Sequence, residues 1–422
     1  VHQGEPVMRR GIVALLASLP VLLVVSGYAW MRDEPLSVDA QTWLEQAQVD
    51  AGPSRAYVFL NGLDADPGQS PEALGAERLQ AYRTWRSSHG PLDEGFAEPL
   101  VPTLALANGP LFCAIEKDGC LSTLLSGVSG WVETDEQRLL RERYWQFLQL
   151  DDYRNLLEDS IMAPLPPYHY LMNGQQLLAL QLLKAAQAGE GEQVRVRLDE
   201  ELQLLRGQMR RADTLIAKMI MVRMVERNMR WQAVLYRQGL MPAPSSVLAF
   251  DQAERSLLRP LQYEFRSVAL MFKSQPSSNL DWKERLLMWW GLRPQMSINA
   301  SLSFYQPLAE LSQLPPAKFA PKVQQLPEPQ WQKSRRNPVG NVLLGMAIPD
   351  FRDYAVRVQD LEVQRRLLQG MSQLPQGVPS AEQLHAFDNP YYPGQPALLD
   401  ERDRLCFAGP LPVRDGARCL PL

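Results

Sequence analysis

The strongest constraint on the fold is a series of segments with helical spacing between residues 131 and 239. The first opens at Thr134, and its apolar residues recur at intervals of three or four, which is the spacing of one helix face. Asn173 is a good cap for the second segment, and the last one ends at Gly239. Short joints between consecutive helices are typical of antiparallel helical hairpins. The series therefore predicts a helical bundle or an α-solenoid, and we find no repeat of the length that helical arrays use.

A second constraint is the stretch from Gly11 to Trp30, which has no charged residue over twenty positions. A helix of that length spans a hydrocarbon core of about 30 Å. Arg9 and Arg10 precede it, so the positive-inside rule predicts a cytoplasmic N-terminus and places the chain after Trp30 on the far side. We therefore expect a single-pass anchor in a bacterial inner membrane, which contacts the lipid bilayer through residues 11–30 and leaves the bulk of the chain in the periplasm.

A cleaved signal peptide is the alternative interpretation of the same stretch. Gly27-Tyr28-Ala29 has the small-x-small form of a cleavage site, and the two preceding arginines make a plausible n-region. The stretch is longer than the roughly 7–15 apolar residues of a signal peptide, however, and no cysteine lies near it to accept a lipid. We expect the segment to be retained, and the mass of the mature N-terminus distinguishes the two interpretations.

Four cysteines form two local pairs, Cys113 with Cys120 and Cys406 with Cys419. An even number of cysteines in an exported chain predicts disulfide bonds formed in an oxidising compartment. Three connectivities are open, of which two local bridges are the simplest. A zinc site would need closer cysteine spacing or a histidine nearby in the sequence, and this pattern has neither. We therefore expect disulfides and assign no metal and no cofactor.

Helical patterns also occupy most of the remaining chain. The apolar run 56–60 is typical of a strand or a buried turn, and the prolines of residues 315–338 predict an extended crossover. We therefore predict a mainly α fold, with a transmembrane helix, a periplasmic helical-hairpin domain and a small turn-rich tail closed by a disulfide. The expected units are a cytoplasmic N-terminus (1–10), the transmembrane helix (11–30), an N-terminal periplasmic region with a local disulfide (31–130), the helical-hairpin domain (131–314), the crossover (315–338) and the C-terminal helix with its tail (339–422).

The charge balance weighs against a nucleic-acid partner. The chain has 43 basic and 47 acidic residues, a formal net charge of −4, and the two signs alternate along it. Nucleic-acid binding requires a basic face that neutralises a row of phosphates. We therefore predict no nucleic-acid partner.

The sequence signatures of common catalytic sites do not occur in the chain. The nearest approach is Gly127-Val128-Ser129-Gly130, which is one residue short of a nucleophile elbow. The four histidines are widely separated, so a catalytic or metal site would need distant segments to meet. They are His2, His89, His169 and His385. We name no catalytic residue.

Three further groups of residues have a structural interpretation that we prefer to a functional one. Asp64 and Asp66 resemble the start of a calcium loop, but its later ligands are missing, and we expect them to stabilise a turn. The methionines between residues 209 and 229 suggest core packing rather than a copper site. The acidic residues at 151–152 and 199–201 are expected on solvated helix faces. Carboxylates that meet only in space leave glycoside hydrolysis open.

Three blocks of the sequence resemble an uncharacterised group of single-pass envelope proteins of Gram-negative bacteria. The blocks are YVFLNGLDADPGQSPEALGAERL, TLIAKMIMVRMVERNMRW and NPVGNVLLGMAIPDFRDYAVRVQDLEVQRRLL, and they are spread over most of the chain. The resemblance implies an envelope location and implies no activity.

The tail GVPSAEQLHAFDNPYYPGQPALLDERDRLCFAGP is similar to the closing module of some pseudopilin-like exported proteins. The turn of that module matches at Asn389, Pro390, Gly394 and Pro396, and Gly409-Pro410 matches its end. The acidic, glycine-rich end that holds calcium in such modules is replaced here by the loop between Cys406 and Cys419. This departure argues against calcium.

Two functions from different classes follow. The leading hypothesis is an inner-membrane-anchored interaction or assembly subunit of a bacterial envelope system, with an envelope protein as its partner. The alternative is a periplasmic hydrolase of peptidoglycan or envelope glycans, which predicts a deep cleft with two or more inward acidic side chains of raised pKa.

Overall fold

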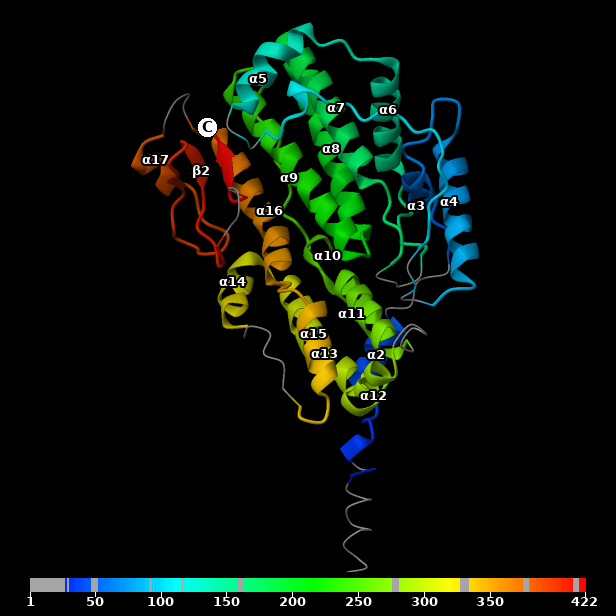
Figure 1. Cartoon of the computed structure of the whole chain (residues 1–422). Helices are drawn as coiled ribbons and strands as arrows, with labels where there is room; N and C mark the ends of the chain where they lie inside the picture. The colour runs from blue at the N-terminus through cyan, green and yellow to red at the C-terminus, as the bar shows by residue number, and fades with distance from the viewer. Residues whose placement is uncertain are drawn as a thin grey trace, which may run out of the picture.

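The computed structural model describes residues 27–28, 30–46, 52–90, 93, 95–115, 117, 119–157, 162–274, 281–326, 334–374, 379–412 and 417–422. Within these ranges the chain is mainly helical, as its periodicity predicts (Figure 1). Long helices lie side by side in the upper half, and a small module at the C-terminus packs along one flank.

The predicted transmembrane helix has to be corrected. Within the described ranges, no helix has both the length and the apolar composition that crossing a bilayer requires. The longest helix, α9 (Leu215–Arg237), carries charged side chains along its whole length. Of residues 11–30, only Gly27, Tyr28 and Trp30 are described, and the others lie outside the described residues. We therefore remove the membrane-spanning helix from the fold class, and with it the single-pass inner-membrane location.

The upper half is built from four long helices. They are α6 (Asp135–Gln149), α7 (Tyr168–Gln187), α8 (Gly191–Arg211) and α9. Thr134 and Gln137 form a capping box at the start of α6, where the sequence predicts it. Helix α7 begins earlier than its predicted cap, because the side chain of Asn173 instead exchanges hydrogen bonds with the backbone of Ala107.

Helices α3 (Arg55–Asn61) and α4 (Pro71–Arg86) form a tight hairpin beside α6. The run 56–60 is therefore helical, neither the strand nor the buried turn that we expected, because Ser54 caps it and its side chains are buried by α4. A Cβ atom on Gly75 would lie 1.9 Å from the carbonyl oxygen of Val58, so only glycine permits this approach.

The lower half contains helices α2 (Val38–Gln46), α11 (Leu258–Lys273), α12 (Trp282–Gly291), α13 (Pro294–Ser312), α14 (Pro316–Gln325) and α15 (Pro338–Ala347). Phe265 of α11 lies between Trp43 of α2 and Tyr305 of α13, with ring centroids 5.9 and 5.8 Å away. Helix α14 occupies part of the crossover that we expected to be extended, because Pro316 fits the first turn of a helix.

The C-terminal module joins helix α17 (Ala381–His385) to a small antiparallel sheet of order β1-β2-β3. Its strands are β1 (Leu398–Leu399), β2 (Arg404–Cys406) and β3 (Cys419–Pro421), and Cys406 faces Cys419 across β2 and β3. The expectation of disulfide bonds is confirmed, because Cys113 is bonded to Cys120 and Cys406 to Cys419. The remaining short helices are α5 (Cys120–Gly127), α10 (Gln252–Arg255), η1 (Pro110–Phe112) and η2 (Val128–Gly130).

Glu201 of α8 is buried at the centre of the upper half, which corrects its expected place on a solvated face. Its carboxyl accepts hydrogen bonds from Tyr144 of α6, Gln175 of α7 and Asn228 of α9. One side chain therefore connects four helices. Burial raises the pKa of Glu201, although the hydrogen bonds oppose that effect.

Replacing Glu201 with Gln tests this polar centre. A carboxyl whose folded-state pKa is raised stabilises the fold below its ordinary value of 4.5, and that stability is lost as the pH rises through the raised pKa. The free energy of unfolding of E201Q should therefore increase relative to that of the wild type as the pH rises above 4.5, with a slope of at most about 1.4 kcal/mol per pH unit. Urea denaturation measures the difference. The exposed neighbour variant E200Q should show no such slope, and parallel curves for E201Q and wild type would contradict the prediction.

Lys218 of α9 is also buried, at 1% exposure, and its Nζ donates to the carbonyl oxygens of Met209 and Glu254 at 2.9 and 2.8 Å. Burial lowers the pKa of Lys218 to about 7, and the nearby charge of Glu254 opposes the shift. The side chain therefore connects α8, α9 and α10 through a pair of backbone carbonyls.

The variant K218M should lose a pH-dependent part of its stability. Between about pH 7 and the ordinary value of 10.5, the unfolded chain holds a proton on Lys218 that the native chain releases, so native stability rises with pH. The free energy of unfolding of the wild type should therefore increase relative to that of K218M from about pH 7 to 9. Thermal unfolding across this range measures the effect, with the exposed K184M as control. A constant difference between wild type and K218M would refute the assigned pKa.

Candidate functional site

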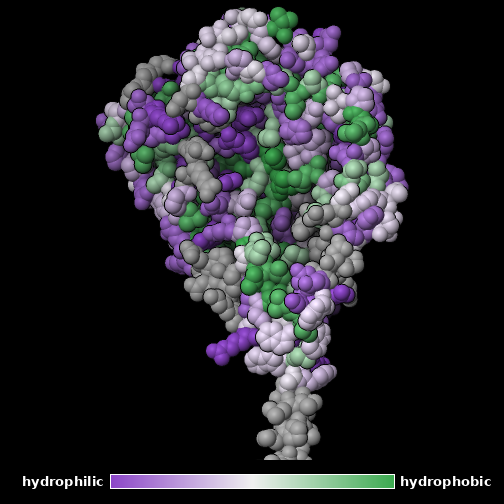
Figure 2. Space-filling view, viewed as in Figure 1, coloured by the Kyte–Doolittle hydropathy of each residue, from purple (hydrophilic) through white to green (hydrophobic). Residues whose placement is uncertain are grey.

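A groove of about 1270 Å³ lies between α9, helix α16 (Arg352–Met371) and the C-terminal module. Figure 2 shows hydrophilic residues gathered over this part of the surface. Its basic residues are Lys117, Arg223, Arg357, Arg402, Arg404 and Arg418, and its acidic residues are Glu226, Asp353, Asp360, Asp400 and Glu401. The groove is therefore strongly charged, and both signs are mixed along it.

Both disulfide-closed loops border this groove. The loop between Cys113 and Cys120 contributes Ala114 and Lys117, and the loop between Cys406 and Cys419 contributes residues that include Arg418. A disulfide bond restricts the conformations that the backbone of such a loop can adopt in the unfolded chain. The two disulfide bonds are separate from each other and border different walls of the groove.

The floor of the groove contains a buried ion pair. Arg418 donates from Nε to Oδ1 of Asp360 at 2.7 Å, and the hydroxyl of Tyr391 donates to the same oxygen at 2.7 Å. Burial raises the pKa of Asp360, although the charge of Arg418 opposes it. Gly409 makes room for the guanidinium, since a Cβ atom there would lie 2.2 Å from Cζ of Arg418.

Among the residues of α16 that line the groove, two buried acceptor atoms are without a hydrogen-bond partner within the described part of the chain. They are Oδ2 of Asp360 and Oε1 of Gln364, whose Nε2 donates to the carbonyl oxygen of Ala417. Residues four apart share one face of a helix, so both acceptors lie along the same line of the groove. A buried acceptor without a donor is costly, and such a pair suits a ligand that brings N–H or O–H groups.

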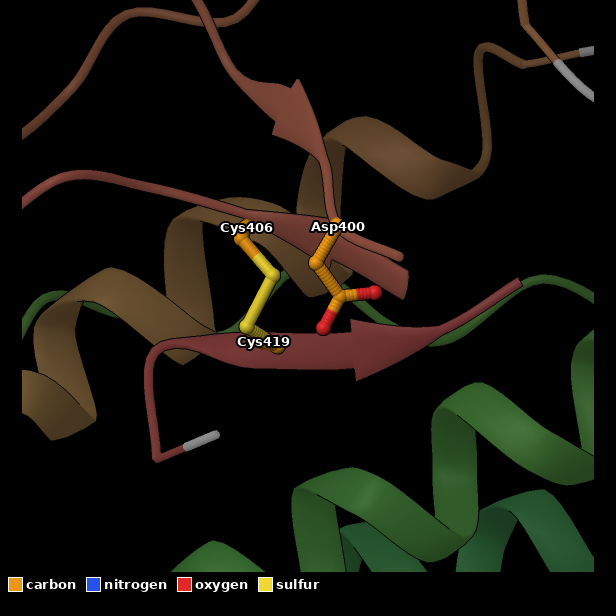
Figure 3. A group of neighbouring side chains, drawn as sticks. All are labelled: Asp400, Cys406 and Cys419. Carbon is orange, nitrogen blue, oxygen red and sulfur yellow. A yellow bond between two sulfur atoms is a disulfide. The ribbon is translucent and has the colours of Figure 1, made fainter. Parts of the chain in front are cut away.

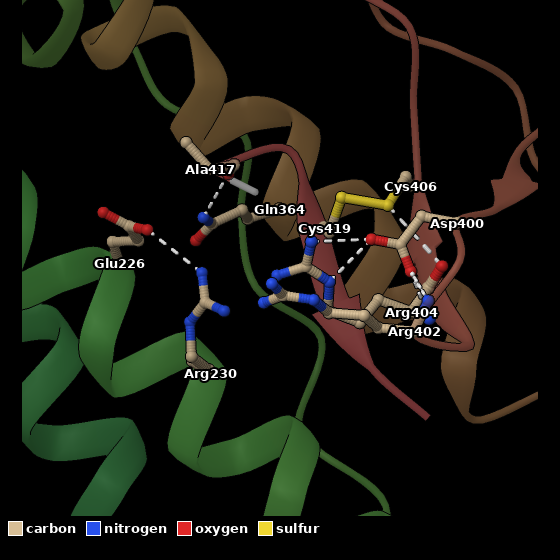
Figure 4. The surroundings of a disulfide bond; sticks show 9 residues. All are labelled: Glu226, Arg230, Gln364, Asp400, Arg402, Arg404, Cys406, Ala417 and Cys419. Carbon is tan, nitrogen blue, oxygen red and sulfur yellow. Dashed lines mark hydrogen bonds and ion pairs between the residues drawn. A yellow bond between two sulfur atoms is a disulfide. The ribbon is translucent and has the colours of Figure 1, made fainter. Parts of the chain in front are cut away.

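The rim is held by further ion pairs, which Figure 4 shows around the second disulfide. The figure draws the pair of Glu226 with Arg230 on α9 and the pair of Arg404 on β2 with Asp400, at 2.6 Å. Glu226 also contacts Arg223. Burial acts to raise the pKa of Asp400, but hydrogen bonds from Arg404 outweigh it and lower the pKa. Asp400 therefore stays ionised at neutral pH.

Asp400, Cys406 and Cys419 lie close enough for their ligand atoms to share one ion (Figure 3). The two sulfurs are bonded to each other, however, so neither is a thiolate ligand. The Asp400 carboxylate also accepts from Arg404. The cluster is therefore a disulfide beside an ion pair, and we assign no metal to it.

The other residues considered from the sequence lie elsewhere. Asp64 pairs with Arg78 inside the α3–α4 hairpin, and Asp152 caps the start of α3, which corrects its expected place on a solvated face. The described histidines lie apart, after the end of α4 (His89), on α7 (His169) and on α17 (His385), and His2 is outside the described residues. Most of the methionines between residues 209 and 229 are in the core: Met209, Met221, Met224 and Met229 are buried and Met219 lines the groove.

Comparison with protein-family models, with curated proteins and with solved structures gave no match. The resemblance of the sequence blocks to envelope proteins and of the tail to a closing module therefore stays a prediction.

Sequence reasoning missed the groove because its residues come from separate segments. Asp360 and Gln364 lie on a helix whose apolar side was expected to do the packing, yet α16 is buried on nearly every side. The sequence offered one signal for the groove: α16 contains polar residues within a segment whose apolar content is typical of a buried helix.

Removing Arg418 tests the floor of the groove. The variant R418M leaves the Asp360 carboxylate buried without its cation, and we expect a loss of about 3–5 kcal/mol in the free energy of unfolding. The control R357M removes an exposed arginine of the same groove and should cost less than about 0.5 kcal/mol. Denaturation by urea measures both. Equal stability of R418M and wild type would show that the ion pair does not hold the module.

Proposed function

We propose that this protein is an interaction subunit that holds a segment of a partner polypeptide in the groove between α9, α16 and the C-terminal module. The observation that carries the proposal is the pair of buried, unsatisfied acceptors on Asp360 and Gln364 at its floor. Backbone N–H groups of an extended peptide are donors of the kind that such acceptors need.

The charges of the walls add specificity. Arg357 is exposed in the groove, and Asp353 and Glu401 offer the opposite sign. A partner segment with both acidic and basic side chains complements this pattern, and mismatched charges are rejected. The volume exceeds the roughly 300–1000 Å³ typical of small-molecule sites, which also favours a polypeptide ligand.

An envelope assembly is the setting that we propose for the partner. The resemblance of three sequence blocks to Gram-negative envelope proteins supports it. Two disulfide bonds support it too, since such bonds persist in oxidising compartments.

The alternative, a hydrolase of peptidoglycan or envelope glycans, has less support. Such an enzyme needs two carboxyl groups with distinct roles, one of them with a raised pKa. Asp360 has a raised pKa, but its carboxylate is engaged by Arg418 and Tyr391. The pKa of Asp400 is lowered, and Arg404 engages it. This geometry favours binding over hydrolysis.

Crosslinking in intact cells tests the proposal. A photoreactive amino acid at Met219, which lines the groove, should trap one defined partner, whose crosslinked peptide is identified by mass spectrometry. The same residue at Val132, which is 80% exposed outside the groove, should not trap it. In the Met219 background, R357E should lower the yield by about tenfold and R357K should retain most of it. Equal products from both positions, or none from Met219, would reject the groove as a peptide site.

A further inference from the structure

We propose that helix α12, together with the adjoining end of α15, docks onto the surface of a lipid bilayer. The docking surface consists of Trp282, Leu286, Leu287, Trp289 and Trp290 of α12 and Met346 of α15, all of them exposed. This contact is peripheral, involves no helix that spans the bilayer, and goes beyond the peptide groove.

Helix α12 projects from the fold instead of packing into it. Of its residues only Gly291 is buried, and Gly291 contacts α15, where a Cβ atom would lie 2.6 Å from Val339. Trp282 and Trp289 are 67% and 62% exposed, and Met346 is 79% exposed. An apolar cluster of this size on a single exposed helix indicates a contact that lies outside the chain's own core.

The amino-acid composition of α12 favours a lipid bilayer as the partner of this surface. Tryptophan prefers the boundary between headgroups and acyl chains, and leucine prefers the acyl chains. Lys283 and Arg285 are exposed on the same helix and can reach lipid phosphates. The acidic residues Asp281 and Glu284 are engaged in a capping box with each other's backbone N–H, at the helix start.

The contacts of residues 30–33 bear on the same lipid-docking surface. Asp33 accepts hydrogen bonds from Gln295 and Met296, in the first turn of α13 directly after α12. Arg336 donates to the carbonyl oxygen of Trp30. Residues 30–33 therefore lie beside the start of α13, which directly follows α12 at the narrow lower end in Figures 1 and 2. Residues 11–26, which precede this segment in the sequence, contain no charged side chain.

Quenching of tryptophan fluorescence by phosphatidylcholine vesicles with brominated acyl chains tests the proposal on the full chain. Wild type should be quenched by the vesicles. The variant W282F/W289F/W290F keeps an apolar surface but should lose most of that quenching. This readout is specific to α12, because binding through residues 11–26 alone would leave the quenching of the two proteins equal. Equal quenching would overturn the proposal.

A second pair of variants keeps every tryptophan. The change L286Q/L287Q removes the leucines that enter the acyl region and should reduce quenching by at least about threefold. The matched control L248Q alters a leucine that is 80% exposed away from α12 and should leave quenching unchanged. If light scattering shows a dimer that L286Q/L287Q dissociates while vesicles quench nothing, the occupant is a second copy and the lipid proposal fails. Crosslinking from Met219 reports the groove separately.

Discussion

The buried carboxyl of Glu201 is the interaction on which the upper half depends. Three helices reach it with a hydroxyl or an amide, and the fourth carries it, so the register of the bundle is fixed by a polar contact inside an apolar core. A buried polar group must keep all of its partners to avoid a desolvation cost, whereas apolar side chains tolerate small shifts. With the bundle in register, α9 presents Met219 and Glu226 along one side of the groove.

Helix α16 connects the bundle to the other segments of the molecule through side-chain hydrogen bonds. It is packed on nearly all sides, and its polar side chains bind backbone groups at the end of α13 and in segments that have no regular structure. Gln359 donates to the carbonyl oxygens of Ser312 and Leu314, and Arg365 donates to that of Val247. Since those carbonyls have no helix partner, the side chains of α16 satisfy them and hold the loops in place. Three described acceptors of α16 lack a hydrogen-bond partner, on Gln359, Asp360 and Gln364, and the last two of these residues line the groove.

The sequence predicted what local patterns encode. The mainly helical fold and the start of α6 at Thr134 follow from spacing and capping, which are properties of adjacent residues. The run 56–60 was mistaken because five apolar residues do not distinguish a strand from a short helix, and the cap at Ser54 decided it. The expected membrane helix rested on hydropathy and the structure corrected it. Burial of Glu201 and the pairing of Asp360 with Arg418 were inaccessible, because their partners are distant in sequence and each residue alone resembles a solvated charge.

The position of Arg418 in the chain has a consequence for truncated forms of the protein. In the sequence, Arg418 comes after every other residue that lines the groove, and it forms the ion pair with Asp360 on the floor. The floor of the groove therefore becomes complete only when Arg418 has reached Asp360. A chain that is cut before Arg418 would therefore keep the other residues of the groove and lose the cation that neutralises Asp360 on its floor.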